Sequence, residues 1–177
     1  MTIITRIAAG LSLALVPALA CAATPAVPAA PGVIPLPLQP VVGVDKRTCA
    51  TKATSGLGYT VLKAATGQKA AKGDFVLVNY IGYLAASGQV FDQNMTAPFR
   101  SDQVIPGFTE ALGMMPRGAI YRFCIPAALG YGVAGAGAEI PPNSDLVFQV
   151  ELLDSRTPAE VEAMRAQAGP QGDAPKP

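Results

Sequence analysis

The sequence predicts a single α+β domain, an antiparallel β-sheet with one short α-helix. Two observations lead to this prediction. Five short runs of aliphatic, β-branched and aromatic residues follow one another through the middle of the chain, separated by turns rich in Gly, Pro and Ser. One stretch between them, 109–115, has the composition of one or two helical turns and ends at Pro116. Successive strands with a single short helix are typical of an α+β arrangement.

The five expected strands differ in length. The second is the longest, and its alternate residues Val76, Val78 and Tyr80 share one face. A glycine-rich loop, 129–142, separates the fourth strand from the fifth. In chain order the expected strands are 59–62, 74–84, 90–92, 119–125 and 146–153.

Residues 1–21 have the pattern of a secretory signal peptide. Arg6 precedes an apolar run from Ile7 to Leu19, which is short for a membrane span of roughly 20 residues. The sequence Ala18-Leu19-Ala20 fits a cleavage site, so we expect export to the periplasm. Cleavage that leaves a lipidated Cys21 is the alternative, and only in that case do we expect a membrane anchor.

Residues 22–54 are expected to form a Pro- and Ala-rich tether and N-terminal extension in front of a domain at 55–156. Proline blocks helix formation and favours extended polyproline conformations, so the tether is expected to be semi-rigid. A short proline-rich recognition motif is the functional alternative for this segment. The prolines lie at positions 25, 28, 31, 35, 37 and 40.

Residues 157–177 are expected to form a short C-terminal helix and a disordered tail. Thr157 suits the N-cap, Pro158 the first helical position and Glu160 the third, as in a capping box. Gly169 suits the helix end, so the helix is expected over about 158–167.

The composition excludes several kinds of chemistry. The 177 residues include no His and only three Cys, which argues against imidazole catalysis and against tetrahedral zinc sites, so no metal is expected. With 13 basic and 12 acidic residues the net charge is +1, which argues against nucleic acid as a partner.

Cys49 and Cys124 are expected to form a disulfide. Export places the chain in an oxidising compartment, and removal or lipidation of Cys21 leaves these two thiols. Cys124 lies on the face of its strand opposite Phe123, from which a bond to a preceding strand is geometrically reasonable. A catalytic cysteine is the alternative, which the absence of His disfavours.

A set of motifs between about Ser55 and Arg156 resembles FKBP-type peptidyl-prolyl isomerases of the secreted bacterial, single-domain kind. Their order and spacing match along this whole region, and the combination is far more specific than any one piece. The resemblance implies a twisted antiparallel sheet wrapped around one short helix, with a pocket between them. The motifs are VNYIGYL, VFD, QVIPGF, EALGMMPRG, IPAALGYG, IPPN and LVFQVELLD.

The resemblance also implies which residues form the pocket. Phe108 occupies a position where the family usually has Trp, at the pocket floor, whereas Phe75 and Phe123 are assigned to the core. Residues expected to act in catalysis are Asp92, Tyr131, Ile105 (through its backbone N–H) and Phe148. Residues expected to bind substrate are Tyr80, Phe91, Phe99, Val104, Phe108 and Ile140.

The implied activity is peptidyl-prolyl cis-trans isomerisation during the folding of exported proteins, without a cofactor. The expected partners are proline-containing unfolded or partly folded polypeptides and macrolide inhibitors of the FK506 and rapamycin type. A proline-rich tether cannot form the long N-terminal helices through which some related secreted isomerases dimerise, so a monomer is expected. A non-catalytic chaperone or proline-segment binding module that uses the same pocket is the alternative function.

Overall fold

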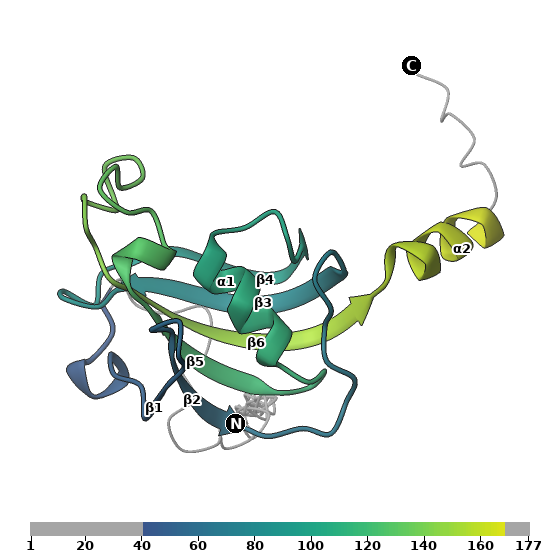
Figure 1. Cartoon of the computed structure of the whole chain (residues 1–177), viewed down its shortest axis with the longest axis horizontal. Helices are drawn as coiled ribbons and strands as arrows, with labels where there is room; N and C mark the ends of the chain where they lie inside the picture. Colours follow the sequence, from purple (N-terminus) through teal and green to yellow (C-terminus); the bar gives the residue numbers. More distant parts are fainter. Residues whose placement is uncertain (1–40, 169–177) are drawn as a thin grey trace, which may run out of the picture.

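A computed structural model describes residues 41–168 of the chain (Figure 1). The predicted signal peptide, Cys21, the tether through residue 40 and the tail from Gly169 lie outside the described residues. The elements in chain order are η1 (Val44–Lys46), β1 (Thr51–Lys52), β2 (Gly58–Lys63), β3 (Phe75–Leu84), β4 (Val90–Arg100), α1 (Pro106–Met114), β5 (Ile120–Ile125), η2 (Ala127–Leu129), β6 (Leu146–Arg156) and α2 (Pro158–Ala168).

The strands form one six-stranded antiparallel sheet in the order β1-β2-β5-β6-β3-β4. Helix α1 lies across one face of this sheet, while α2 extends away from the body of the domain (Figure 1). The expected α+β class is therefore confirmed. A sixth strand, the two-residue β1, adds to the five that were expected.

Strand β4 is much longer than the prediction of 90–92. It runs to Arg100 and pairs with β3 along its whole length, with register shifts near Tyr80 and near Gly82. Thr96 has a positive φ of 59°. Because its residues are largely exposed and its register is irregular, the strand shows no regular alternation of apolar and polar residues.

Both helices begin where their N-terminal residues favour it. Helix α1 starts at Pro106, three residues before the expected start, since proline at the first helical position loses no hydrogen bond. The capping box of α2 is confirmed: the Thr157 N–H donates to Glu160 Oε2 at 2.7 Å, and the Glu160 N–H donates to Thr157 Oγ1 at 3.2 Å.

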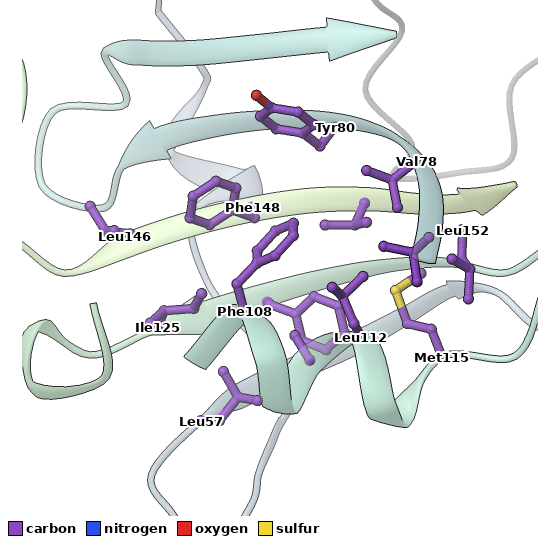
Figure 2. Close-up of a cluster of buried hydrophobic side chains, with 14 of the residues drawn as sticks. Leu57, Val78, Tyr80, Phe108, Leu112, Met115, Ile125, Leu146, Phe148 and Leu152 are labelled. Atoms are coloured by element: carbon purple, nitrogen blue, oxygen red, sulfur yellow. The ribbon is translucent and has the colours of Figure 1, made fainter. Parts of the chain in front are cut away.

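The main core fills the space between the sheet and α1 (Figure 2). Leu112 and Met115 contribute from the helix side, and Val78 and Phe123 contribute from the strands, all with no exposed surface. The core assignment of Phe123 is therefore confirmed. The assignment of Phe75 was wrong, because this residue lies at the start of β3, half-buried, with the Arg100 guanidinium 5.5 Å from its ring centroid.

A second, smaller cluster lies on the opposite face of the sheet, under the segment 41–50. Val42 packs there against Ile81, Tyr83 and Val147, all four at most 2% exposed. The Tyr83 hydroxyl donates a hydrogen bond to the Lys46 carbonyl oxygen, which holds the segment against the strand. The residues from 41 on are thus part of the packed domain, although the predicted domain begins at residue 55.

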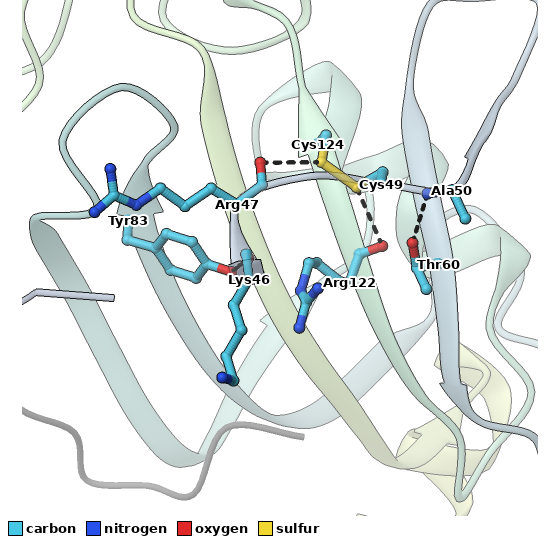
Figure 3. The surroundings of a disulfide bond; sticks show 8 residues. All are labelled: Lys46, Arg47, Cys49, Ala50, Thr60, Tyr83, Arg122 and Cys124. Carbon is cyan, nitrogen blue, oxygen red and sulfur yellow. Dashed lines mark hydrogen bonds between the residues drawn. A yellow bond between two sulfur atoms is a disulfide. The ribbon is translucent and has the colours of Figure 1, made fainter. Parts of the chain in front are cut away.

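The Cys49–Cys124 disulfide, expected from the sequence, is present in the structure, with the two Cα atoms 6.0 Å apart (Figure 3). It joins the segment before β1 to β5, across β2. Gly58 of β2 pairs with Cys124, and a Cβ at this glycine would lie 3.0 Å and 3.1 Å from the Cβ atoms of Cys124 and Cys49. The absence of a side chain at Gly58 therefore allows the bond to cross the strand.

Stability is expected to fall at alkaline pH partly through Tyr83. Burial raises the pKa of its hydroxyl from 10.0 to about 12. Above pH 10 the unfolded chain loses this proton and the folded chain keeps it, so the free energy of unfolding falls as pH rises, by about 3 kcal/mol for this group. Denaturant titrations of wild type and Tyr83→Phe between pH 8 and 12 measure the effect.

The Tyr83→Phe variant is expected to start less stable by about 1 kcal/mol at pH 8, because it lacks the bond to Lys46. Its stability then declines less steeply than that of wild type between pH 10 and 12. If the free energy of unfolding fell equally steeply with pH in both proteins, the raised pKa of Tyr83 would not be the cause of the alkaline loss of stability.

Candidate active site

A cavity of about 510 Å³ opens between the sheet and the N-terminal end of α1. All ten residues predicted from the sequence to act in catalysis or substrate binding line it, together with Gln103, which the sequence did not single out. The lining residues are Tyr80, Phe91, Asp92, Phe99, Gln103, Val104, Ile105, Phe108, Tyr131, Ile140 and Phe148.

Five parts of the fold supply these side chains. Tyr80 lies on β3, and Phe148 lies on β6. Phe91 and Asp92 are neighbours on β4. Phe99, which lies outside the expected strand 90–92, also belongs to β4. Val104 and Ile105 precede α1, Phe108 lies in its first turn, and the glycine-rich loop contributes Tyr131 and Ile140.

Phe108 and Phe148 form the buried base of the cavity, at 4% and 6% exposure (Figure 2). Their ring centroids are 5.1 Å apart, in an edge-to-face arrangement. Phe91 meets Phe148 at 5.5 Å, and Phe99 meets Tyr80 at 5.6 Å. Edge-to-face and tilted contacts of this kind are favourable, so the rings around the cavity stabilise one another.

A hydrogen bond at the rim joins the Tyr80 hydroxyl to Asp92 Oδ2 at 2.6 Å. Burial of the Tyr80 hydroxyl, followed by this bond to the Asp92 carboxylate, raises the pKa of Tyr80 well above its usual value. The hydroxyl is therefore protonated at neutral pH and donates to Asp92. Asp92 is the only ionisable carboxyl among the residues that line the cavity.

Two further polar groups belong to residues that line the cavity and have no hydrogen-bond partner within residues 41–168. The Ile105 N–H, at the N-cap of α1, forms no hydrogen bond with any described residue, while its carbonyl accepts from Phe108 and Thr109. The second is the hydroxyl of Tyr131, a residue that is 39% exposed. An N–H donor and a phenol hydroxyl at the rim of an aromatic cavity can bind the carbonyl groups of a peptide whose apolar ring lies inside.

Sequence reasoning missed two residues of this site. Gln103 is exposed and directly precedes Val104, but a lone Gln carries no distinguishing signal. Gly82 of β3 lies behind the aromatic wall: a Cβ there would be 2.6 Å from Phe148 and 2.8 Å from Phe91. A glycine in a strand interior is the available sequence signal for such a close approach.

The Gly82→Ala substitution is expected to displace Phe91 and Phe148 and to destabilise the domain by about 1–3 kcal/mol, as overpacking of a core does. Gly113→Ala, in the exposed part of α1 where a Cβ would meet nothing within 4 Å, is the matched control. It is expected to stabilise by about 0.5–1 kcal/mol, since alanine favours helix. Urea denaturation measures both, and an unaltered stability of Gly82→Ala would contradict the close packing.

A second cavity, of about 430 Å³, lies beside the Cys49–Cys124 disulfide. No aromatic residue lines it, and its one carboxylate, Asp145, already accepts a hydrogen bond from the Ala127 N–H at 2.9 Å. The aromatic cavity is therefore the better candidate for an active site.

Residues 41–168 hold no group of three or more His, Cys, Asp or Glu side chains placed to bind a metal ion. Within the same residues, no helix combines the length and apolar character needed to cross a membrane.

Fold and cavity together define an α+β domain with an aromatic ligand site between an antiparallel sheet and one helix. The family model for FKBP-type peptidyl-prolyl cis-trans isomerase matches residues 66–153. The outer membrane protein MIP of Legionella longbeachae is 42% identical over 109 residues, covering 59% of this chain and 46% of that protein. The FKBP-type peptidyl-prolyl cis-trans isomerase FkpA of Escherichia coli K12 is 43% identical over 125 residues, which cover 68% of this chain and 44% of that protein.

Solved structures agree with these matches. A peptidyl-prolyl cis-trans isomerase from Pseudomonas syringae pv. tomato is 40% identical, with a TM-score of 0.58, and the alignment covers 60% of this chain and 80% of that one. The chain therefore belongs to the family of FKBP-type peptidyl-prolyl cis-trans isomerases. It spans about half the length of the curated relatives that it matches.

Proposed function

We propose that the chain is a peptidyl-prolyl cis-trans isomerase that accelerates rotation about X-Pro bonds in exported proteins as they fold. The observation that carries the proposal is the aromatic cavity, which is lined by Tyr131 and by Ile105, whose N–H has no hydrogen-bond partner in the described part of the chain. Family membership supports the same activity.

Prolyl rotation needs no acid, base or nucleophile, which suits a site whose lining is mostly aromatic and aliphatic. The barrier is about 18–20 kcal/mol because rotation breaks amide resonance. The twisted amide is less charge-separated than the planar one, so a cavity that excludes water favours the twisted state. Lowering the barrier by roughly 6–8 kcal/mol accelerates rotation by about 10⁴–10⁶-fold.

The proposed roles follow the positions of the residues. The proline ring enters over Phe108 and against Phe148, while the Ile105 N–H and the Tyr131 hydroxyl bind substrate carbonyl groups. Asp92 orients the Tyr80 hydroxyl, which keeps both at fixed positions beside the bond that rotates. Phe91, Phe99, Val104 and Ile140 complete the walls around the ring.

Exchange spectroscopy by NMR on a Leu-Pro peptide tests the activity. Purified protein is expected to raise the rate of cis-trans exchange far above the uncatalysed rate, which corresponds to tens to hundreds of seconds. If the protein binds unfolded, proline-containing chains but leaves the exchange rate unchanged, the isomerase proposal fails and the chain is a non-catalytic binding module with the same pocket.

We propose further that the chain acts as a monomer in the periplasm, on proline-containing polypeptides, and that macrolides of the FK506 and rapamycin type compete for its cavity. The signal pattern of residues 1–21 supports export, and a relative is named an outer membrane protein. The intact mass of the exported protein reports cleavage and any lipid on Cys21. Light scattering that gives a dimeric mass would contradict the monomer.

A further inference from the structure

We propose that the aromatic cavity has an internal ligand, the chain's own segment 33–38, with sequence Val-Ile-Pro-Leu-Pro-Leu. The proposal rests on the proposed function, because it assumes that the cavity accepts a proline ring. It adds an occupant from the same molecule, which competes with substrates.

The first support is the position at which the described chain begins. Val41 forms an antiparallel bridge with Gln89, and the Val42 N–H donates to the Gly88 carbonyl oxygen at 2.8 Å. The carbonyl oxygen of Gln89 accepts a hydrogen bond from the Leu84 N–H of β3. Val41 therefore lies on the side of Gln89 away from β3, at the edge where the sheet ends with β4.

The attachment at this edge is well anchored. Arg47 donates from Nε to the Val42 carbonyl oxygen and from a terminal guanidinium nitrogen to the Ala86 carbonyl oxygen, each at 2.8 Å. Gly88 has a φ of +76°, and a Cβ there would lie 2.2 Å from the Val42 carbonyl oxygen. The start of the described chain is thus held against the β3–β4 turn.

The second support is the chain direction. Because the Val41–Gln89 bridge is antiparallel, an extended chain continued backward from Val41 would run in the direction of β4 from Gln89. Phe91 and Asp92, which line the cavity, follow Gln89 by two and three positions, or about 7–10 Å along a strand. An extended tether that follows this direction would reach the residues of β4 that line the aromatic cavity.

The third support is length and chemistry. Pro37 and Pro35 lie four and six positions before Val41, which allows an extended chain to span up to about 14 Å and 20 Å. Leu36 and Ile34 supply a large apolar residue before each proline. No charged residue occurs from position 22 to 40, so entry into the apolar cavity buries no charge.

A linker this short gives the segment an effective concentration in the millimolar range at the cavity. A proline segment with millimolar affinity is then bound for a large part of the time. Removing it is expected to lower the apparent Kd of a free Leu-Pro peptide by roughly two- to tenfold.

The test compares the full exported chain with its Pro35→Ala/Pro37→Ala variant. Pro25→Ala/Pro28→Ala is the control, because those prolines lie farther from Val41, where effective concentration is lower. NMR titration with a Leu-Pro tetrapeptide is expected to give tighter binding to the first variant only. The Ile105 N–H resonance is expected to shift between wild type and that variant before any peptide is added.

Identical peptide affinities and identical Ile105 resonances in wild type and Pro35→Ala/Pro37→Ala would overturn the proposal. A wild-type resonance that depends on protein concentration would also overturn it, because the occupant would then be a second copy. If no form accelerates prolyl exchange, the proposed function fails, whereas the shift of the Ile105 resonance still reports on docking. An active wild type with no such shift leaves the function intact and rejects the internal ligand.

Discussion

Replacing Cys49 and Cys124 together by alanine is expected to lower the free energy of unfolding by about 4–5 kcal/mol. The bond closes a loop between residues 75 positions apart, and removing it restores that much conformational entropy to the unfolded chain in the loop-closure description. Domains of this size are stable by about 5–15 kcal/mol, so the variant is expected to be marginal at 37 °C.

Because the disulfide does not line the aromatic cavity, its removal is expected to lower the stability of the domain without lowering its isomerase activity. Cys124 packs with the small cluster on the face of the sheet opposite α1, whereas Phe123, beside it in β5, packs toward α1. The sulfur atoms lie 3.8 Å and 4.0 Å from the carbonyl oxygens of Arg122 and Arg47; these are contacts, since a disulfide sulfur carries no hydrogen (Figure 3). At 10 °C, where the domain stays folded, we expect prolyl exchange rates near those of wild type.

Urea denaturation with and without dithiothreitol measures the effect on stability. The reductant is expected to destabilise wild type by an amount similar to the double substitution, and to leave the double variant unchanged. A loss below about 1 kcal/mol in both experiments would show that the unfolded chain gains little freedom when the bond is removed.

Phe148→Leu is expected to reduce kcat/KM for a Leu-Pro peptide by about 30- to 100-fold, equivalent to about 2–3 kcal/mol of transition-state stabilisation. The ring of Phe148 contacts those of Tyr80, Phe91 and Phe108, with the shortest centroid distance, 5.1 Å, to Phe108. The smaller leucine side chain is expected to leave a gap among these rings. Water could then enter beside the twisting amide, and the proline ring of the substrate would be held less firmly.

Phe123→Leu is the matched control for this substitution. Phe123 is a fully buried phenylalanine of the same sheet, but it does not line the cavity. Both variants are expected to lose roughly 1–2 kcal/mol of stability through imperfect packing. Only Phe148→Leu is expected to lose activity, and equal catalytic losses in the two variants would reject the role proposed for Phe148.

Most of the fold was predictable because periodicity reports burial. The alternation through Val76, Val78 and Tyr80 marks the face of β3 that packs toward α1, and these residues are 7% exposed or less. The same signal failed for β4, which lies at the sheet edge, where exposure leaves no regular pattern to read. The core assignment of Phe75 was wrong for a related reason, because one aromatic residue in an apolar run does not indicate on which face of the strand it lies.

The site was predictable as a set of residues, because motifs between Tyr80 and Phe148 resemble those of one family in order and spacing. Their distances in space were not predictable. That Asp92 accepts a hydrogen bond from Tyr80 depends on how β3 and β4 pair across their register shifts, with Asp92 opposite Gly82. Likewise, the need for glycine at 82 comes from two rings that reach it from β4 and β6.

The sequence by itself determined the α+β class, the long strands β3 and β6, the capped C-terminal helix and the cysteine pair, because each depends on residue type and on spacing along the chain. Only the tertiary structure decided that residues 41–50 cover the outer face of the sheet and that the chain enters the domain beside Gln89, near the cavity. These features come from contacts between segments far apart in the sequence, such as Arg47 with Ala86, 39 positions away, and Val42 with Gly88. Local propensity cannot predict such contacts, because their free energy exists only once the sheet has formed.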